Sequence, residues 1–185
     1  GHEVKLIPPQ YVKPYVKTNK TDAADAEAIC EAVTRPNMRF VQIKTEEQQA
    51  VLALHTEQGI LIRERIACAN SLRATLADFG ITIAAGQSHL TRELPAILED
   101  SENGLSPFVR TSIYRQSKHI RELEEQVKQV EEALASWYRT QEACQRMAKI
   151  PGVGMLTATY VVAAVGNARQ FSTAKQFASW LGLTP

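Results

Sequence analysis

One stretch of the chain carries a heptad repeat of apolar residues, which constrains the fold more than any other feature. Ser106 and Pro107 open this stretch as a helix start, because proline is tolerated in the first helical turn. Apolar residues then recur at heptad spacing, namely Ile113, Ile120, Leu123, Val127, Val130, Leu134 and Trp137. The spacing predicts a long helix with one apolar seam, as in a coiled coil.

A second long helix is predicted upstream, from Thr45 to about Asp78. Thr45 and Gln48 have the spacing of a capping box at its start, and Gly80 suits the position after its end. Three arrangements remain open: an antiparallel hairpin of the two helices, a coiled coil between two chains, or a stripe that simply packs on its own domain.

The N-terminal region has a mixed pattern. Val4–Ile7 reads as a short strand that Pro8 and Pro9 end, and Phe40–Ile43 reads as a short strand or an extended link. The segment Lys13–Lys20 is expected to be extended because it contains Pro14. A helix is predicted from Asp22 to Thr34.

Shorter helices are predicted around and after the long pair. One covers Arg92–Glu99, and a sharp turn at Ile150–Gly154 precedes an apolar helix over Met155–Val165. A last helix begins at Phe171-Ser172, with Ser172 as its N-cap, and ends at Gly182. The fold class is therefore mainly α.

The charge is unevenly distributed although the net charge is only +1. The first twenty residues carry four lysines against one glutamate, and no acidic residue follows Glu142. Basic ends around an acidic middle fit a protein whose ends meet phosphate, but ordinary surface charge also produces such a pattern. No apolar run approaches the roughly 20 residues of a membrane span, so no membrane partner is expected.

The cysteines and histidines support neither a disulfide framework nor a zinc site. Cys30, Cys68 and Cys144 are widely separated and form no CxxC pair, and the four histidines are equally scattered. A reducing compartment is the expected location.

Asp22 and Asp25 are the first candidates for chemistry. On a helix, residues three apart lie about 5–6 Å apart on one face, where two carboxylates can bracket a divalent cation such as Mg²⁺. Aspartates at a helix start also serve as caps and oppose the helix dipole, which is the commoner role. The pattern places Asp22 in line with Ala26, Ile29 and Val33, which predicts that the pair borders a buried face.

Gly152 and Gly154 are the second candidates. Glycines ahead of a helix let a phosphate approach the free N–H groups of the first turn, as in a helix-hairpin-helix that grips a nucleic-acid backbone. A plain turn between two helices is the alternative.

The residues resemble a known family. Val12–Lys17 followed by Lys20–Ala26, with the string Lys-Thr-Asp-Ala-Ala-Asp-Ala, resembles the end of the RuvC-like catalytic domain in insertion-sequence 110 family transposases of the DEDD type. The long helices resemble the coiled-coil insert of that family. Ile150–Gly154 and the stretch through Ala178–Pro185 resemble the start of its C-terminal transposase domain.

The resemblance covers essentially the whole chain and implies three parts. Residues 1–44 would be the C-terminal remnant of an α/β RNase H-like domain, 45–147 the coiled-coil region, and 148–185 the opening of the transposase domain. The chain would be an internal fragment that is inactive alone, since the family's other Asp and Glu ligands lie upstream and its serine lies downstream.

The resemblance also implies activity and partners. Asp22 and Asp25 match the last two of the family's four acidic Mg²⁺ ligands, and Lys17 and Lys20 are hypothetical phosphate contacts. Family members cleave and rejoin DNA, are guided by a structured RNA, and act as oligomers, here through the coiled coil. The protein would act at the nucleoid, in the cytoplasm of a bacterium or archaeon.

Two alternatives stay open. One is a Holliday-junction-resolving nuclease with the same acidic quartet, which would lack a serine domain. The other is a non-enzymatic coiled-coil module that only binds nucleic acid.

Overall fold

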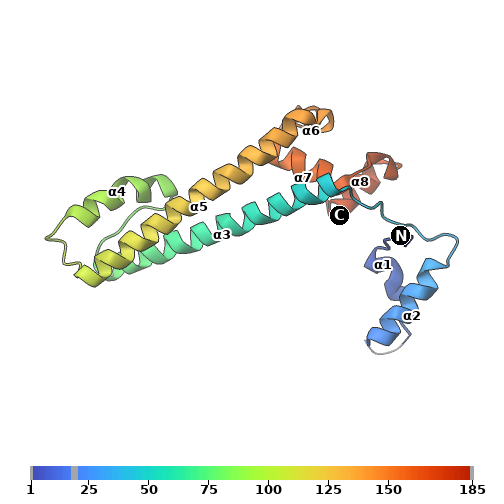
Figure 1. Ribbon diagram of the computed structural model, residues 1–185, viewed down its shortest axis with the longest axis horizontal. Coiled ribbons are helices and arrows are strands. Elements are labelled where there is room, and N and C mark those ends of the chain that lie inside the picture. The colour runs from blue at the N-terminus through green and yellow to red at the C-terminus, as the bar shows by residue number, and fades with distance from the viewer. Residues whose placement is uncertain (1, 18–20, 184–185) are drawn as a thin grey trace. The chain divides into compact units, whose positions relative to one another are not determined.

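The computed structural model describes residues 2–17 and 21–183, which form helices and no β-strand (Figure 1). In chain order the elements are α1 (Pro9–Val12), the 3-10 helix η1 (Lys13–Tyr15), α2 (Asp22–Val33), α3 (Glu46–Asp78), α4 (Gln87–Glu99), α5 (Pro107–Thr140), α6 (Glu142–Met147), α7 (Met155–Val165), the 3-10 helix η2 (Ala168–Gln170) and α8 (Ala174–Trp180). The chain divides into two compact units, one spanning Ala50–Val162 and one formed by the residues before and after it. The prediction of a mainly α fold is confirmed.

The two long helices α3 and α5 form an antiparallel hairpin (Figure 1). The Gln58 amide donates a 2.7 Å hydrogen bond to Glu131, and the Nε2 atom of His119 lies 3.1 Å from a Glu64 oxygen. Because the partner number falls along α5 as the number rises along α3, the helices run in opposite directions. Among the predicted arrangements, the hairpin within one chain is the one that the structure adopts. Association of two chains through this region stays a prediction.

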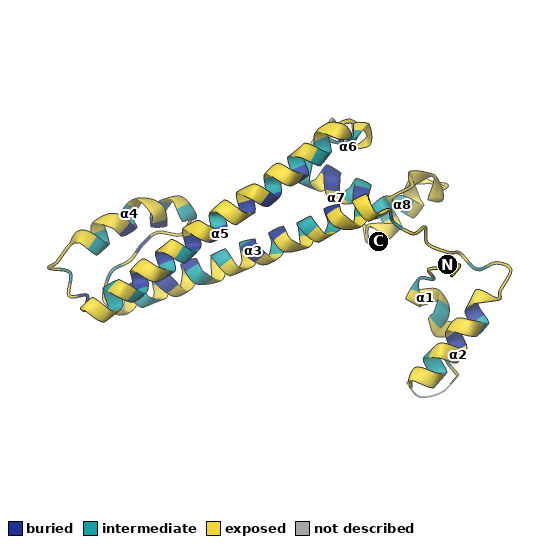
Figure 2. Ribbon diagram, viewed as in Figure 1, coloured by how far each residue is buried: buried dark blue, intermediate teal, exposed yellow. Residues whose placement is uncertain are grey.

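The heptad stripe forms the seam of the hairpin (Figure 2). Its α5 residues Ile113, Ile120, Leu123, Val127, Val130 and Leu134 are all buried, as are Val51, Leu61, Leu72 and Leu76 on α3. The capping box at the start of α3 is also formed: the Thr45 N–H donates to the Gln48 side chain, and the Gln48 N–H donates to the Thr45 hydroxyl. The predicted helix pattern is therefore confirmed at both the seam and the cap.

Helix α4 covers one end of the hairpin, with Leu90 and Leu94 in the same buried cluster as Ile113 and Leu72. It begins at Gln87, so the predicted start at Arg92 was too late; Gly86, with a φ of 109°, turns the chain into the helix. At and beyond its C-terminal end, the Arg110 guanidinium from α5 donates to the Leu98, Asp100 and Leu105 carbonyls over 2.9, 2.5 and 3.1 Å.

Helix α7 packs on both α6 and α3. The buried Cys144 thiol of α6 lies 3.8 Å from the Ala158 carbonyl, and burial raises the pKa of that thiol. His55 of α3 lies 3.0 Å from the buried Thr159 hydroxyl and contacts the Tyr160 ring edge-on. These contacts fix the start of α7 against the hairpin.

The last helix, α8, begins one residue later than the sequence pattern predicted. Thr173 is its N-cap, and its hydroxyl accepts a hydrogen bond from the Gln176 N–H. The prediction of Ser172 as the cap was wrong, because Ser172 instead donates its N–H and hydroxyl to the Gln176 side chain.

The predicted N-terminal strands are reduced to a single antiparallel bridge between Leu6 and Val41, whose N–H donates to the Leu6 carbonyl over 2.7 Å. The two segments find no further strand among the described residues, so they form no sheet. The expected extension of Lys13–Lys20 was also wrong over its first three residues. Pro9 and Pro14 sit at the starts of α1 and η1, where a missing N–H costs nothing.

None of the helices in the described ranges is both long enough and apolar enough to cross a membrane.

Candidate metal and nucleic-acid site

The start of α2 carries the two aspartates that the sequence singled out. Thr21 is the N-cap, and its hydroxyl accepts a 3.2 Å hydrogen bond from the Ala24 N–H. Asp22 and Asp25 both lie in the first turn, and neither carboxylate forms a hydrogen bond or ion pair with another described residue. Since Thr21 performs the capping, both carboxylates are free to bind a ligand, although their charges also favour the helix N-terminus.

The buried face of α2 differs from the predicted one. Ala28 and Ala32 are fully buried, whereas Ile29 is 51% exposed and Val33 is also exposed. The prediction of a buried Asp22–Val33 stripe was therefore wrong. Helix α2 contacts α1 and η1, and the small alanine side chains allow those short helices to approach closely.

Asp25 nevertheless faces a groove. A hollow of about 990 Å³ is lined by Asp25, Ile29 and Val33 from α2 and by Lys5, Leu6, Ile7, Pro9, Gln10, Val12, Lys13 and Val16 from the preceding segment. Asp25 is half-buried there, while Asp22 is exposed. The carboxylate of Asp25 thus meets a mainly apolar surface with two lysines in its lining.

The described residues supply at most part of a metal site. No group of three or more His, Cys, Asp or Glu side chains in residues 2–17 and 21–183 is arranged to hold a metal ion. Mg²⁺ is commonly held by one or two carboxylates, with waters and substrate phosphates completing its shell. Asp22 and Asp25 fit that donor set as half of a site.

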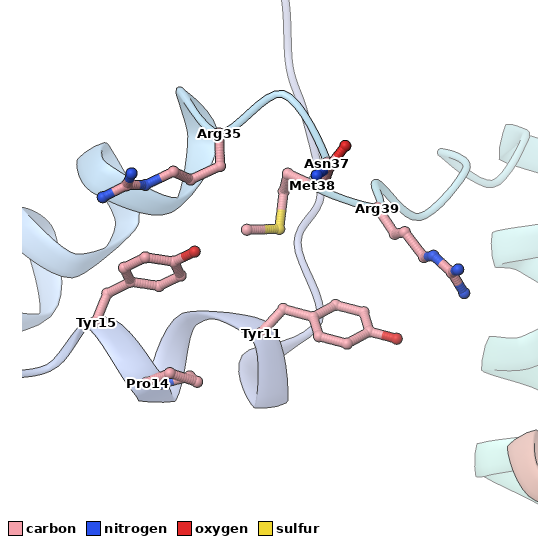
Figure 3. A pocket seen from close by; sticks show the side chains of 7 residues that line it. All are labelled: Tyr11, Pro14, Tyr15, Arg35, Asn37, Met38 and Arg39. Atoms are coloured by element: carbon pink, nitrogen blue, oxygen red, sulfur yellow. The ribbon is translucent and has the colours of Figure 1, made fainter.

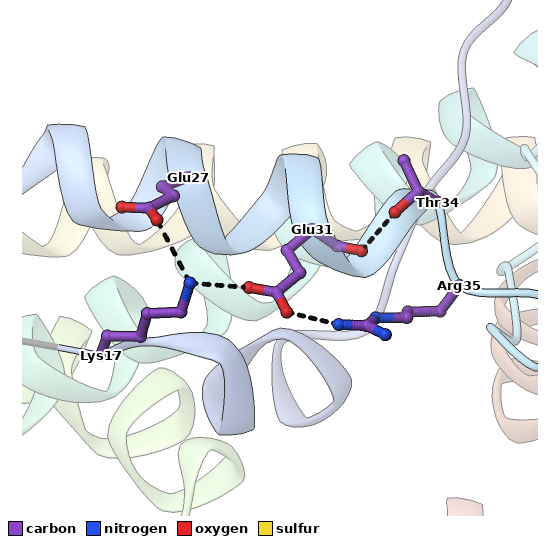
Figure 4. A network of polar contacts seen from close by, with 5 residues as sticks. All are labelled: Lys17, Glu27, Glu31, Thr34 and Arg35. Atoms are coloured by element: carbon purple, nitrogen blue, oxygen red, sulfur yellow. Dashed lines mark hydrogen bonds and ion pairs between the residues drawn. The ribbon is translucent and has the colours of Figure 1, made fainter.

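Lys17 takes part in an ion-pair network on another face of α2 (Figure 4). Its ammonium lies 3.2 Å from Glu31 and 3.3 Å from Glu27, while Arg35 also pairs with Glu31. Hydrogen bonds from Arg35 and Lys17 lower the pKa of Glu31, and those to Glu31 and Glu27 raise the pKa of Lys17. A phosphate at Lys17 would therefore compete with two carboxylates. Lys20, the other predicted contact, lies outside the described residues.

The glycine turn lies between α6 and α7 as predicted. Gly152 has a φ of 86°, a conformation that favours glycine, and the Val153 N–H closes the turn on the Ile150 carbonyl over 3.0 Å. Apart from the adjacent residues, no heavy atom of the described chain lies within 4 Å of the position that a Cβ would take at Gly152 or Gly154, so the backbone there is open to an approaching group. A phosphate contact at these glycines stays a prediction.

Sequence reasoning missed a second pocket in the N-terminal region (Figure 3). It has a volume of about 340 Å³ and is lined by Tyr11, Pro14, Tyr15, Arg35, Asn37, Met38 and Arg39. The lining residues come from two segments, residues 11–15 and 35–39. With residues 13–20 expected to be extended, the sequence offered no reason to place these segments together. The helical turn η1, which the sequence pattern did not reveal, turns Tyr15 toward Arg35.

Comparison with known proteins relates this chain to a family of transposases. A family model described as Transposase, of the DEDD type of IS110, matches residues 1–81, and a model described as Transposase IS116/IS110/IS902 family matches residues 144–185. The chain belongs to the IS110/IS116/IS902 family of insertion-sequence transposases.

Relatives of known name match the whole chain. The chain is 40% identical to the transposase for insertion sequence element IS1328 of Yersinia enterocolitica and 42% identical to that for IS1111A of Coxiella burnetii. Both matches include 100% of this chain but only 54% and 51% of the relatives. The chain therefore spans about half the length of the relatives it matches. No solved structure matches it.

Proposed function

We propose that the intact protein cleaves and rejoins DNA strands of its insertion sequence in a Mg²⁺-dependent reaction. The observation that carries this proposal is the match of two transposase family models, in order, to the beginning and the end of the chain. The names of the relatives, which are transposases of insertion sequence elements, agree with it.

In this proposal Asp22 and Asp25 are ligands of the metal ion. Both carboxylates lie on the first turn of one helix without a partner among the described residues, and the Thr21 hydroxyl caps that helix. When bound, Mg²⁺ would stabilise negative charge on the phosphate and help activate the attacking hydroxyl. The two aspartates would hold the cation, and the remaining oxygen ligands would come from elsewhere in the intact protein and from the DNA.

The proposed partners are DNA, a structured guide RNA and further copies of the chain. The open backbone at Gly152 and Gly154 supports a phosphate contact, because the first N–H groups of a helix such as α7 have no partner within the helix and can bind an anion. Lys17 and Lys20 are proposed to contact phosphate as well, and the chain to act at the nucleoid in the cytoplasm. Because it spans only about half the length of its relatives, the 185-residue chain is proposed to be inactive alone.

The test is Asp25→Ala in the intact protein. We expect recombination between element ends to be lost, and binding of Mn²⁺, a paramagnetic substitute for Mg²⁺, to weaken in electron paramagnetic resonance. Thr21→Ala is the matched control, since it weakens the same helix start by about 1 kcal/mol without removing a carboxylate. We expect Thr21→Ala to keep Mn²⁺ binding.

The outcomes separate the alternatives. Unchanged recombination in Asp25→Ala would reduce Asp25 to a residue that favours the helix dipole. Cleavage of four-way junctions without rejoining would indicate a junction-resolving nuclease. An intact protein that binds nucleic acid but neither cuts nor joins it would be the non-enzymatic module.

A further inference from the structure

The small pocket beside α1 and η1 combines aromatic, thioether and cationic side chains and has no acidic residue in its lining. Tyr11 is 38% exposed, so its ring is available to a ligand. Figure 3 shows Tyr11, Tyr15 and Met38 facing one pocket, the tyrosines from the N-terminal turns and Met38 from the segment after α2. Flat rings beside a polarisable sulfur suit a planar aromatic ligand.

The two arginines of the pocket have different roles. Arg35 pairs with Glu31, which Lys17 also contacts, and its guanidinium carbon lies 5.4 Å from the centre of the Tyr15 ring. Its charge is therefore compensated, and its flat group extends the wall formed by Tyr15. Arg35 is a positioning residue in this arrangement.

Arg39 carries the uncompensated charge. It is exposed and forms no hydrogen bond or ion pair with another residue of the described ranges. In Figure 3 its guanidinium extends toward the same side of the pocket as the Tyr11 hydroxyl. An anionic group attached to a ring held at Tyr11 would therefore find a free cation at the rim.

The geometry points to a site for one unpaired nucleotide, with its base against Tyr11 and Met38 and its phosphate at Arg39. The pocket volume of about 340 Å³ is near the lower end of the roughly 300–1,000 Å³ of ligand sites, which suits one nucleotide. In a duplex the neighbouring base pairs cover both faces of each internal base, so a base that stacks on a side chain comes from a single strand. This inference rests on the proposed function only in taking the partner to be nucleic acid.

The test measures binding of the 185-residue chain to labelled oligothymidylate, oligouridylate and a blunt DNA duplex by fluorescence anisotropy. Tyr11→Ala should weaken single-strand binding about tenfold, the scale of one lost stacking contact. Tyr11→Phe keeps the ring and should bind as the unchanged chain does. Tyr114→Ala is the matched control, since Tyr114 is an exposed tyrosine of α5, and circular dichroism verifies the helix content of each variant.

A second variant tests the phosphate contact separately from packing. The logarithm of the affinity falls as the logarithm of the salt concentration rises. Arg39→Gln should make this fall less steep by about 0.7, the value for one phosphate contact on a single strand. Arg115→Gln, at an exposed arginine of α5, should leave that slope unchanged.

The results decide the inference without depending on recombination. Stronger binding of oligothymidylate assigns the site to a DNA strand, and stronger binding of oligouridylate assigns it to RNA; both support the pocket. No single-strand binding, or equal binding by Tyr11→Ala and Tyr114→Ala, would overturn it. If Tyr11→Ala loses single-strand binding while Asp25→Ala keeps recombination, only the proposed metal role fails. If Tyr11→Ala keeps single-strand binding while Asp25→Ala loses recombination, only the proposed nucleotide pocket fails.

Discussion

The helical hairpin and the N-terminal region differ in the burial of their large apolar residues. In the hairpin, Ile113 and its neighbours on the stripe are buried between α3, α4 and α5. In the N-terminal region α2 buries two alanines, while Ile29 and Val33 line an open groove. The same residue type is therefore 0% exposed at Ile113 and 51% exposed at Ile29.

This difference in burial suggests that the hairpin contributes mainly to stability and the N-terminal region mainly to ligand binding. A buried seam between long helices stabilises the hairpin by removing apolar surface from water. The N-terminal region is held by other means: the Thr21 cap, the Lys17–Glu31–Arg35 ion pairs and the bridge at Leu6. Both of its hollows combine apolar or aromatic side chains with charged ones in their linings, which makes it the region suited to ligands.

The largest effect on stability is expected from replacing an isoleucine by alanine, which we compare between the two regions in separate variants. Ile113→Ala should lower the free energy of unfolding by about 2–5 kcal/mol, because it leaves a cavity in a close-packed seam. Ile29→Ala should lower it by less than about 1 kcal/mol, since half of that side chain is already in water. Urea denaturation followed by circular dichroism measures both.

Circular dichroism reads the helices of both units together, and most helical residues lie within residues 50–162. Val33→Ala, on the same groove as Ile29, serves as a second N-terminal variant. Equal losses at Ile113 and Ile29 would contradict the contrast and would mean that the groove face of α2 contributes to the core.

A smaller effect is expected at Arg110, which joins α4 to α5 without apolar burial. Arg110→Ala should cost about 2–3 kcal/mol, because three backbone carbonyls lose hydrogen bonds from a charged donor. Arg110→Lys should recover only part of this loss, since an ammonium lacks the planar fork of a guanidinium. Hydrogen exchange of the α4 amides measures the local effect; full protection in Arg110→Ala would show that Leu90 and Leu94 suffice to hold the helix.

The two long helices could be predicted from sequence because their signals are local and periodic, whereas their pairing as a hairpin was one of three arrangements left open. The spacing from Ile113 to Leu134 defines one face, Thr45 with Gln48 defines a start, and Gly80 defines an end. Arg110 could not be found in this way. Its partners are carbonyl groups, which carry no sequence signal, and their position depends on how the chain turns between α4 and α5.

The N-terminal region was predicted less well, because its contacts also depend on how the chain turns and carry little local sequence signal. The helix α2 was expected with nearly its observed ends, but its buried face depends on the contacts of α1 and η1, which the prolines suggested would be extended. Ala28 was missed because an alanine carries little periodic signal. The sequence indicated Asp22 and Asp25 as a pair, and their metal role stays a prediction; Arg39 has no motif around it.

The smallest effect is expected from pH, at the contact between α3 and α7. Burial lowers the pKa of His55. The Thr159 hydroxyl lies 3.0 Å from the carbonyls of Met155 and Leu156, to which it can donate, so it accepts from the Nε2–H of a neutral His55. The unfolded chain therefore binds the His55 proton at a higher pH than the folded chain does. The stability from neutral His55 is present above about pH 6.5, the ordinary pKa of histidine, and is lost as the pH falls through the lower pKa of the folded state.

Thermal unfolding between neutral pH and about pH 5 measures this effect, before carboxylates with pKa values near 4 begin to titrate. The unchanged chain should lose stability over this range, and His55→Gln should lose less, because glutamine can still donate to Thr159 but does not titrate. His89→Gln is the control, since His89 contacts Arg92 and Glu93 on α4 instead of α7. Parallel pH profiles for the chain and His55→Gln would show that protonated His55 is accommodated at α7, and the hairpin would then tolerate a buried charge that its apolar seam excludes elsewhere.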